Sequence, residues 1–141
     1  MGRINWSRVI LGGLLAGVVL NIVDFILYGV VLKDDSAAAM RALGKSGAMT
    51  TNLILWFVFL DFLFGIFLVW LYAAIRSRYG AGAKTAVWAG LAMWVLFGLL
   101  LALGEAPMGI FPQRLWVIGT LVALVEYPLA ALAGGWAYKE A

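Results

Sequence analysis

Long apolar runs alternate with short polar segments along this chain. A membrane helix needs about 20 mostly apolar residues, and four runs reach that length. They cover residues 9–32, 53–75, 85–103 and 115–138. The pattern predicts an all-α membrane protein, a bundle of four transmembrane helices that forms a single domain over residues 1–141.

The longest connection, residues 33–52, has a pattern of its own. Asp34-Asp35-Ser36 precede an Ala-rich stretch that ends at Gly44. Acids before helix formers and a glycine after them predict a short helix over residues 35–43, capped by the acids and lying on the membrane surface. In the fourth run, Pro128 lacks the N–H that would bond the Leu124 carbonyl, which predicts a kink.

Composition narrows the chemistry. Hydrophobic residues make up 65% of the chain and charged residues 12%, and both Cys and His are absent. These absences exclude disulfides, thiolate or imidazole metal sites, and Cys or His catalysis. No phosphate-binding, dinucleotide or nucleophile motif occurs. We therefore expect no enzyme activity, no cofactor and no metal. The net charge is +3, and the basic residues lie beside the apolar runs, so they do not indicate a nucleic-acid-binding surface.

The distribution of Lys and Arg predicts the topology. With four spans, the N-terminus, the middle loop and the C-terminus share one side, and that side holds six cations against four on the other. The six are Arg3, Arg8, Arg76, Arg78, Lys84 and Lys139; the four are Lys33, Arg41, Lys45 and Arg114. The positive-inside rule then predicts that both termini lie in the cytoplasm. As localisation we expect a bacterial inner membrane, although the sequence does not distinguish this membrane from another bilayer.

Three carboxyl groups inside the apolar runs are the most informative feature. Asp24, Asp61 and Glu126 have no Lys or Arg within the same runs, and each costs roughly 2.5–3.5 kcal/mol at a helix centre. With a rise of about 1.5 Å per residue, all three fall within one helical turn of each other in depth. Either protonated acids join the helices by hydrogen bonds, or they contact a partner subunit, or they form a proton- or cation-binding site. Its expected surroundings are Asn21, Tyr28, Trp94 and Tyr127, with the Trp94 indole donating to a carboxyl group.

Small residues share a helix face with each acid. Gly13 and Gly17 form a GxxxG pair in the first run, which allows another helix to approach closely. We interpret this pair as packing inside the bundle, with dimerisation as the alternative. The expected helix-packing glycines are Gly13, Gly17, Gly65, Gly90, Gly119 and Gly134.

A weak internal repeat is visible. Residues 13–20 resemble residues 90–97, and residues 60–63 resemble residues 125–129. The repeat would relate two parallel helical hairpins about an axis along the membrane normal. The alternative is chance similarity among apolar residues.

Two short motifs carry a resemblance. Asn5-Trp6-Ser7-Arg8-Val9 and the Gly-rich residues 11–17, with fainter likeness at residues 42–44 and 70–76, resemble the corresponding parts of small uncharacterised bacterial four-helix integral membrane proteins. The resemblance implies the fold and no function. In size and span number the chain is also similar to small multidrug transporters, which use a Glu in their first helix. Here the first-helix acid is Asp24, and no sequence match supports that analogy.

Three functions fit these features. The first is a structural or accessory subunit that forms a homo-oligomer or docks into a larger membrane complex, in which protonated acids would join helices by hydrogen bonds. The second is a proton- or cation-coupled small transporter or channel that uses the intramembrane acids. The third is binding of an apolar pigment, quinone or lipid, which no motif supports.

Overall fold

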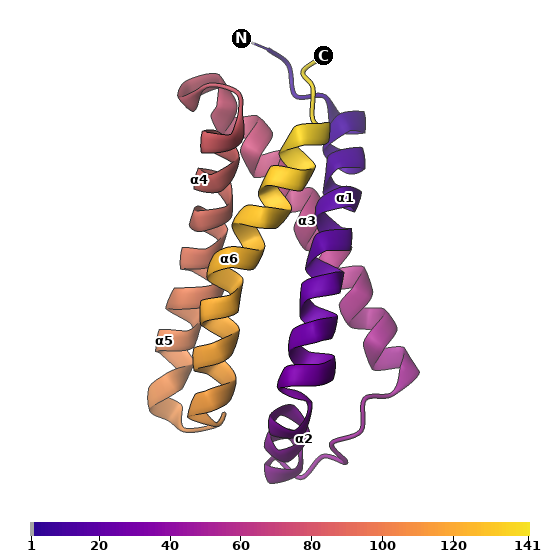
Figure 1. Ribbon diagram of the computed structural model, residues 1–141, viewed down its shortest axis with the longest axis vertical. Helices are drawn as coiled ribbons and strands as arrows, with labels where there is room; N and C mark the ends of the chain where they lie inside the picture. Colours follow the sequence, from indigo (N-terminus) through magenta and orange to yellow (C-terminus); the bar gives the residue numbers. More distant parts are fainter. Residues whose placement is uncertain (1) are drawn as a thin grey trace.

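The chain folds into a bundle of four long helices (Figure 1). The structure is a computed structural model that describes residues 2–141, and this part of the chain contains helices but no strands. Four helical stretches are long and apolar enough to cross a membrane: Trp6–Val31, Thr51–Tyr79, Ala83–Met108 and Gln113–Ala137. The prediction of an all-α bundle with four membrane helices is confirmed.

Two of the four spans change their helical type along their length. The first consists of α1 (Trp6–Ile26) and the π-helical η1 (Leu27–Val31). The third consists of α4 (Ala83–Trp94), the π-helical η2 (Val95–Leu100), α5 (Leu101–Glu105) and the 3₁₀ turn η3 (Ala106–Met108). The second and fourth spans are the single helices α3 (Thr51–Tyr79) and α6 (Gln113–Ala137). The hydrophobic pattern does not indicate the π-helical segments.

The long helices begin before the apolar runs begin. The Asn5 side chain accepts a hydrogen bond from the Arg8 N–H at 3.2 Å, and the Thr50 hydroxyl accepts one from the Leu53 N–H at 3.3 Å. Such caps satisfy backbone donors that the first helical turn leaves free. Capping therefore sets where the first and second spans start, whereas hydropathy marks only the part that crosses the bilayer.

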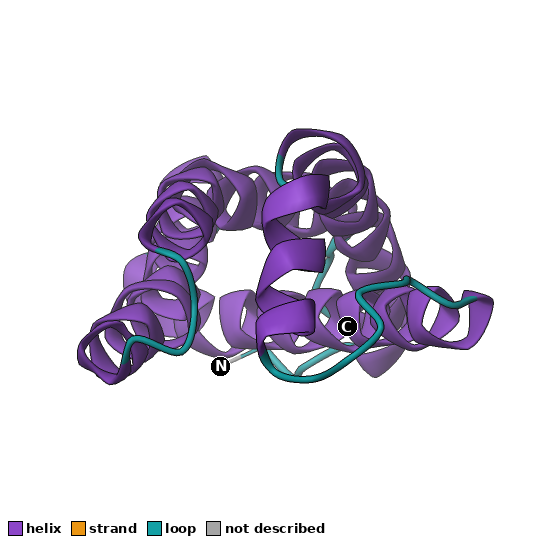
Figure 2. Ribbon diagram, turned by 90° about the horizontal axis from the view of Figure 1, so that it is seen from below, coloured by secondary structure: helices purple, strands orange, loops and turns teal. Residues whose placement is uncertain are grey.

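The short helix α2 (Lys33–Ala42) occupies the predicted connection but is not capped as expected. Its N-cap is Leu32, and no side chain caps it; Asp34 and Asp35 lie within the first turn instead. Acids in a first turn interact favourably with the positive end of the helix dipole. In Figure 2, α2 lies across one end of the bundle, where Asp35 Oδ2 and Arg114 Nε are 3.2 Å apart and connect α2 to the start of α6.

Glycine contacts hold the long helices together. Gly13 and Gly17 of α1 lie against the backbone and side chains of Ile66 and Phe62 in α3. Gly12 of α1 lies against the carbonyl group of Gly134 in α6. These contacts use the GxxxG face of α1 inside the bundle. In the same way, Gly90 of α4 meets Pro128 and Tyr127 of α6.

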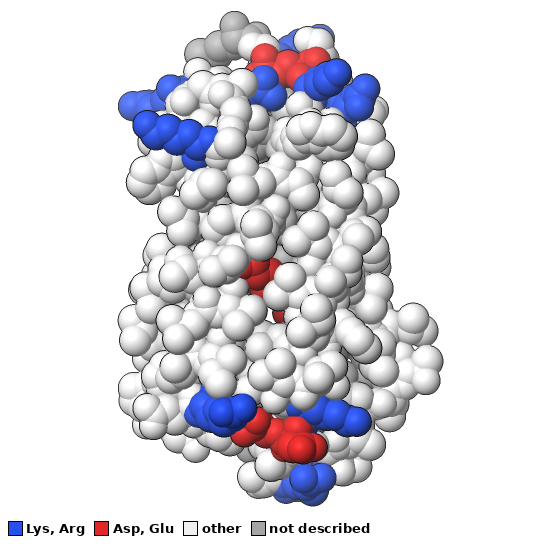
Figure 3. Space-filling view, viewed as in Figure 1, with Lys and Arg blue, Asp and Glu red and all other residues white. Residues whose placement is uncertain are grey.

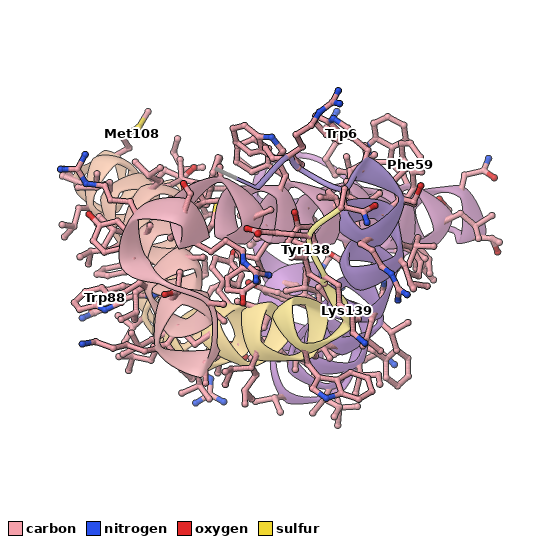
Figure 4. The ribbon with its side chains drawn as sticks, turned by 90° about the horizontal axis from the view of Figure 1, so that it is seen from above. Trp6, Phe59, Trp88, Met108, Tyr138 and Lys139 are labelled. Carbon is pink, nitrogen blue, oxygen red and sulfur yellow. The ribbon has the colours of Figure 1, made fainter. Side chains whose placement is uncertain are left out.

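The end of the bundle that carries both termini is closed by aromatic side chains. Tyr138 is 4% exposed and lies centrally in Figure 4, where Trp6 and Trp88 lie at the periphery. The Tyr138 hydroxyl accepts a hydrogen bond from the Asn5 N–H at 3.1 Å. The Arg76 guanidinium lies 5.2 Å from the centre of the Tyr138 ring, within cation–π range.

The helices diverge toward the opposite end of the bundle. In Figure 1, α1 and α6 lie close together near the termini and separate toward α2, while the first half of α3 projects away from the other helices. The three intramembrane acids belong to three of these diverging helices, α1, α3 and α6.

Candidate functional site

Asp24, Asp61 and Glu126, called the acidic cluster from here on, come together inside the bundle. The Asp24 carboxyl group of α1 lies within interaction range of the carboxyl groups of Asp61 in α3 and Glu126 in α6. Figure 3 shows acidic atoms at mid-height on a face whose other charged side chains lie at the two ends. Three helices distant in the sequence thus each supply one acid to a single site.

Close helix packing explains why these short side chains can meet. Gly17 precedes Asp24 by about two turns, and a Cβ at Gly17 would lie 2.9 Å from the backbone of Phe62, the neighbour of Asp61. At Gly65, one turn beyond Asp61, a Cβ would lie 2.6 Å from the Gly17 nitrogen. Contacts this close leave no room for larger residues at the glycines. They hold α1 against α3 at the distance that two aspartates bridge.

Glu126 is the most deeply buried member of the cluster. It is 3% exposed, and its Oε1 atom is buried without a hydrogen-bond partner among residues 2–141. Asp24 and Asp61 are half-buried. Within the described chain, the ion pairs are Arg76–Glu140 and Arg114–Asp35. Both lie at the ends of the bundle, so no cation compensates the acidic cluster.

Any hydrogen bond within the acidic cluster requires a proton on one of its carboxyl groups. An ionised carboxyl group only accepts hydrogen bonds, so two carboxyl groups bond to each other only when one of them is protonated. Like charges held together in a medium of low dielectric constant also repel strongly. The cluster can therefore hold a proton between helices. Across residues 2–141, no group of three or more acids is arranged to hold a metal ion.

Asn21 and Trp94, two of the expected neighbours of the acidic cluster, donate their hydrogen bonds to backbone carbonyl groups and not to the acids. The Asn21 amide donates to the carbonyl groups of Gly17, at 2.9 Å, and Val58, at 3.5 Å. The Trp94 indole donates to the Thr120 carbonyl at 2.8 Å. The prediction that Trp94 donates to a carboxyl group is wrong, because a backbone carbonyl of the adjacent α6 satisfies the indole at the same depth.

The two tyrosines remain close to the acids. Tyr28 lies within electrostatic range of Asp24 and Glu126, and Tyr127 within range of all three acids. The Tyr28 hydroxyl contacts α6 at Gly119, where a Cβ would lie 3.0 Å from the hydroxyl oxygen. The cluster thus has two phenol groups nearby that can both donate and accept hydrogen bonds.

Sequence reasoning missed two grooves beside α1. The α1/α6 groove, about 410 Å³, is lined by Val23, five apolar residues of α6 and Glu126. The α1/α3 groove, about 490 Å³, is lined by apolar residues and Asn21. Their linings are apolar like the rest of the membrane surface, so the sequence pattern contains no signal for either groove.

Comparison with known proteins gives no match: no family model, curated protein or solved structure is similar to this chain.

Proposed function

We propose that this membrane protein is a proton-coupled transporter in which the acidic cluster binds and releases the proton. One observation carries the proposal: three carboxyl groups from three helices meet within the membrane-crossing part of the bundle. An acid inside a membrane is costly and is usually found where it serves a proton or substrate pathway. One interhelical hydrogen bond needs a single acid and an acceptor, so three acids at one site are more than structural bonding requires.

The partners of the acids support this function over purely structural hydrogen bonding. Structural acids would be expected to bond to backbone carbonyls, as Asn21 and Trp94 do. The acids instead lie within interaction range of one another, and Glu126 Oε1 has no partner among the described residues. A buried acceptor without a donor costs free energy, which binding of a proton or a ligand would recover.

Proton flux into liposomes tests the proposal. The purified protein is reconstituted with a trapped pH-sensitive dye, and a potassium diffusion potential drives protons inward. We expect flux from the unaltered protein, loss of flux in Asp24→Asn and Glu126→Gln, and normal flux in Glu105→Gln. Glu105 is the matched control because it lies at the end of its span, outside the acidic cluster. Flux that is unchanged in Asp24→Asn, or no greater than in empty liposomes, would overturn the proposal.

Assembly as a homo-oligomer or as a subunit of a larger membrane complex is the second candidate. The observation that favours it lies in the first half of α3, where every residue from Thr51 to Leu60 is exposed except Val58, which is half-buried. Leu55 and Trp56 are 60% and 57% exposed. Native mass spectrometry after mild extraction tests it. A hetero-oligomer would support a role as a subunit of a larger complex. A homo-oligomer would support a self-contained carrier built from several copies of this chain. A monomer would contradict the assembly hypothesis.

The proposal also includes an orientation of the chain in the membrane. Both termini and the α3–α4 turn lie at one end of the bundle (Figure 1), and the positive-inside rule supports a cytoplasmic location for that end. The membrane we propose is a bacterial inner membrane. The chain would carry no cofactor and perform no enzymatic reaction. Reporter fusions at Ala141 and within residues 44–50 test the sidedness, and a cytoplasmic signal from the second fusion would reverse it.

A further inference from the structure

We propose that residues 138–140, called the latch from here on, hold the terminal end of the bundle closed, and that release of the latch opens this end to water. The terminal end is the one that carries both termini. The part of the inference that concerns protons rests on the proposed function, because the latch would control access to the acidic cluster from this end. Three features carry the inference: the contacts of the latch, the core beneath it and its exposed ion pair.

The latch is tied to the start of α1 and to the end of α3. The helix α6 ends at Ala137, and Tyr138 continues in an extended conformation that places its ring in the middle of the bundle in Figure 4. The hydroxyl group of Tyr138 accepts a hydrogen bond from the N–H of Asn5, the N-cap of α1, at 3.1 Å. The Tyr138 ring lies edge-on to the Tyr72 ring of α3, with the ring centres 6.0 Å apart. The Arg76 guanidinium is 5.2 Å from the centre of the Tyr138 ring and 5.6 Å from that of Tyr72.

The contact between the two tyrosines extends to the remaining span. The Tyr72 hydroxyl accepts a hydrogen bond at 3.1 Å from the N–H of Gly82, which is the N-cap of α4. Tyr72 and Tyr138 thus connect the terminal ends of all four spans. The two phenol groups close this end by pairs of contacts that break together if the Tyr138 ring leaves its place.

The hydrophobic core lies between the latch and the acidic cluster. In the three helices that carry the acids, the buried core residues precede Asp24 in α1 and follow Asp61 in α3 and Glu126 in α6. Tyr72 and Tyr138 belong to this core and are 3% and 4% exposed. A densely packed apolar core offers no partners to water or to a proton. A proton that moves between the acidic cluster and the terminal end can therefore pass only when this core opens.

The ion pair between Arg76 and Glu140 is the part of the latch that is easiest to release. Arg76 Nε and Glu140 Oε1 are 3.3 Å apart, and the side chains are 15% and 36% exposed. Exposed ion pairs contribute little and are weakened by salt, whereas loss of a buried aromatic ring leaves a cavity and costs far more. The contacts thus predict a ranking, in which removal of the Tyr138 ring opens the end more than removal of the Glu140 charge.

A single cysteine beneath the latch measures this opening, because the chain has no other. Val69 is 0% exposed and lies against Gly12 of α1 and Gly134 of α6, so Val69→Cys places a thiol inside the core. The protein is held in lipid nanodiscs, which leave both ends accessible, and is treated with a charged methanethiosulfonate. We expect slow modification with the latch intact and a rate about tenfold or more higher with Tyr138→Ala, because a buried group reacts in proportion to the population of the open state.

Tyr79→Ala is the matched control, since Tyr79 is 65% exposed and lies near the same end. Equal rates in Tyr138→Ala and Tyr79→Ala would overturn the inference. A second reporter, Leu32→Cys, is also 0% exposed but lies at the opposite end, directly before α2. Its rate should not change in Tyr138→Ala. An equal rise there would show general unfolding and would overturn a latch that acts on one end.

Glu140→Gln keeps the test valid if Tyr138→Ala fails to fold. It leaves the ring in place and should raise the rate at Val69→Cys by a smaller factor, which added salt should reproduce with the latch intact. An unchanged rate in Glu140→Gln would overturn the part of the ion pair in the latch.

The labelling does not depend on transport, so the two proposals fail separately. Labelling as expected without proton flux in liposomes would remove only the transport. Flux through the unaltered protein with unchanged labelling in Tyr138→Ala would remove only the latch.

Discussion

Replacement of Gly90 by alanine tests the packing that brings α4 and α6 together. An alanine Cβ at this position would lie 2.5 Å from the Pro128 Cα and 2.6 Å from the Pro128 nitrogen. Ordinary contact of a Cβ begins near 3.4 Å, so the helices must separate locally by about 1 Å. Both contacts are with backbone atoms, which have no rotamer to change. Overpacking of this kind costs about 1–3 kcal/mol.

Gly104→Ala is the matched control. Gly104 is also helical, but nothing lies within 4 Å of a Cβ at this position. Both variants gain about 0.5–1 kcal/mol from the better helix propensity of alanine. That gain cancels in the comparison, so we expect Gly90→Ala to be about 1–3 kcal/mol less stable than Gly104→Ala.

Equilibrium unfolding in mixed micelles, followed by circular dichroism while the fraction of SDS increases, measures this difference. A difference of about 1.4 kcal/mol corresponds to a tenfold change in the unfolding constant. Equal stability of Gly90→Ala and Gly104→Ala would refute the close α4–α6 contact on which the position of Glu126 depends.

Two further substitutions test individual polar contacts. Trp94→Phe removes the indole bond to the Thr120 carbonyl, and unfolding should show a loss of about 0.5–1.5 kcal/mol; no loss would contradict the bond. Asp35→Asn removes the ion pair with Arg114, whose side chain is 59% exposed, so the same measurement should show a change below about 1 kcal/mol that shrinks with added salt. A larger or salt-independent loss would contradict the exposed position of this pair.

The fold was predictable because the membrane requirement is simple. A helix that crosses a bilayer must be long and apolar, and it must satisfy its own backbone groups. The hydrophobic pattern therefore revealed all four spans. It misplaced their ends, because the second helix continues through Arg76 and Arg78 into polar sequence. The π-helical segments depend on packing, which no local pattern encodes.

The sequence predicted the depth of the candidate site in the membrane, but not the side-chain contacts within it. The positions of Asp24, Asp61 and Glu126 along their helices indicated a shared depth, and in the structure they contact one another. The rotation of each helix and the choice of hydrogen-bond partner depend on neighbouring helices. Trp94 illustrates this, because many carbonyls are available at its depth and the sequence does not specify which one accepts. The parallel repeat of the two hairpins stays a prediction.

The close approach of the three acids can be measured directly, because the chain contains no cysteine. Asp24→Cys is combined with Asp61→Cys or with Glu126→Cys, and the pairs are treated with an oxidant or a short bifunctional maleimide in membranes. Asp24→Cys with Leu63→Cys is the control, since Leu63 is 46% exposed and lies on the other face of α3. The account predicts cross-links in both acid pairs and none in the control. Absence of both acid cross-links, or an equal one in the control, would contradict it.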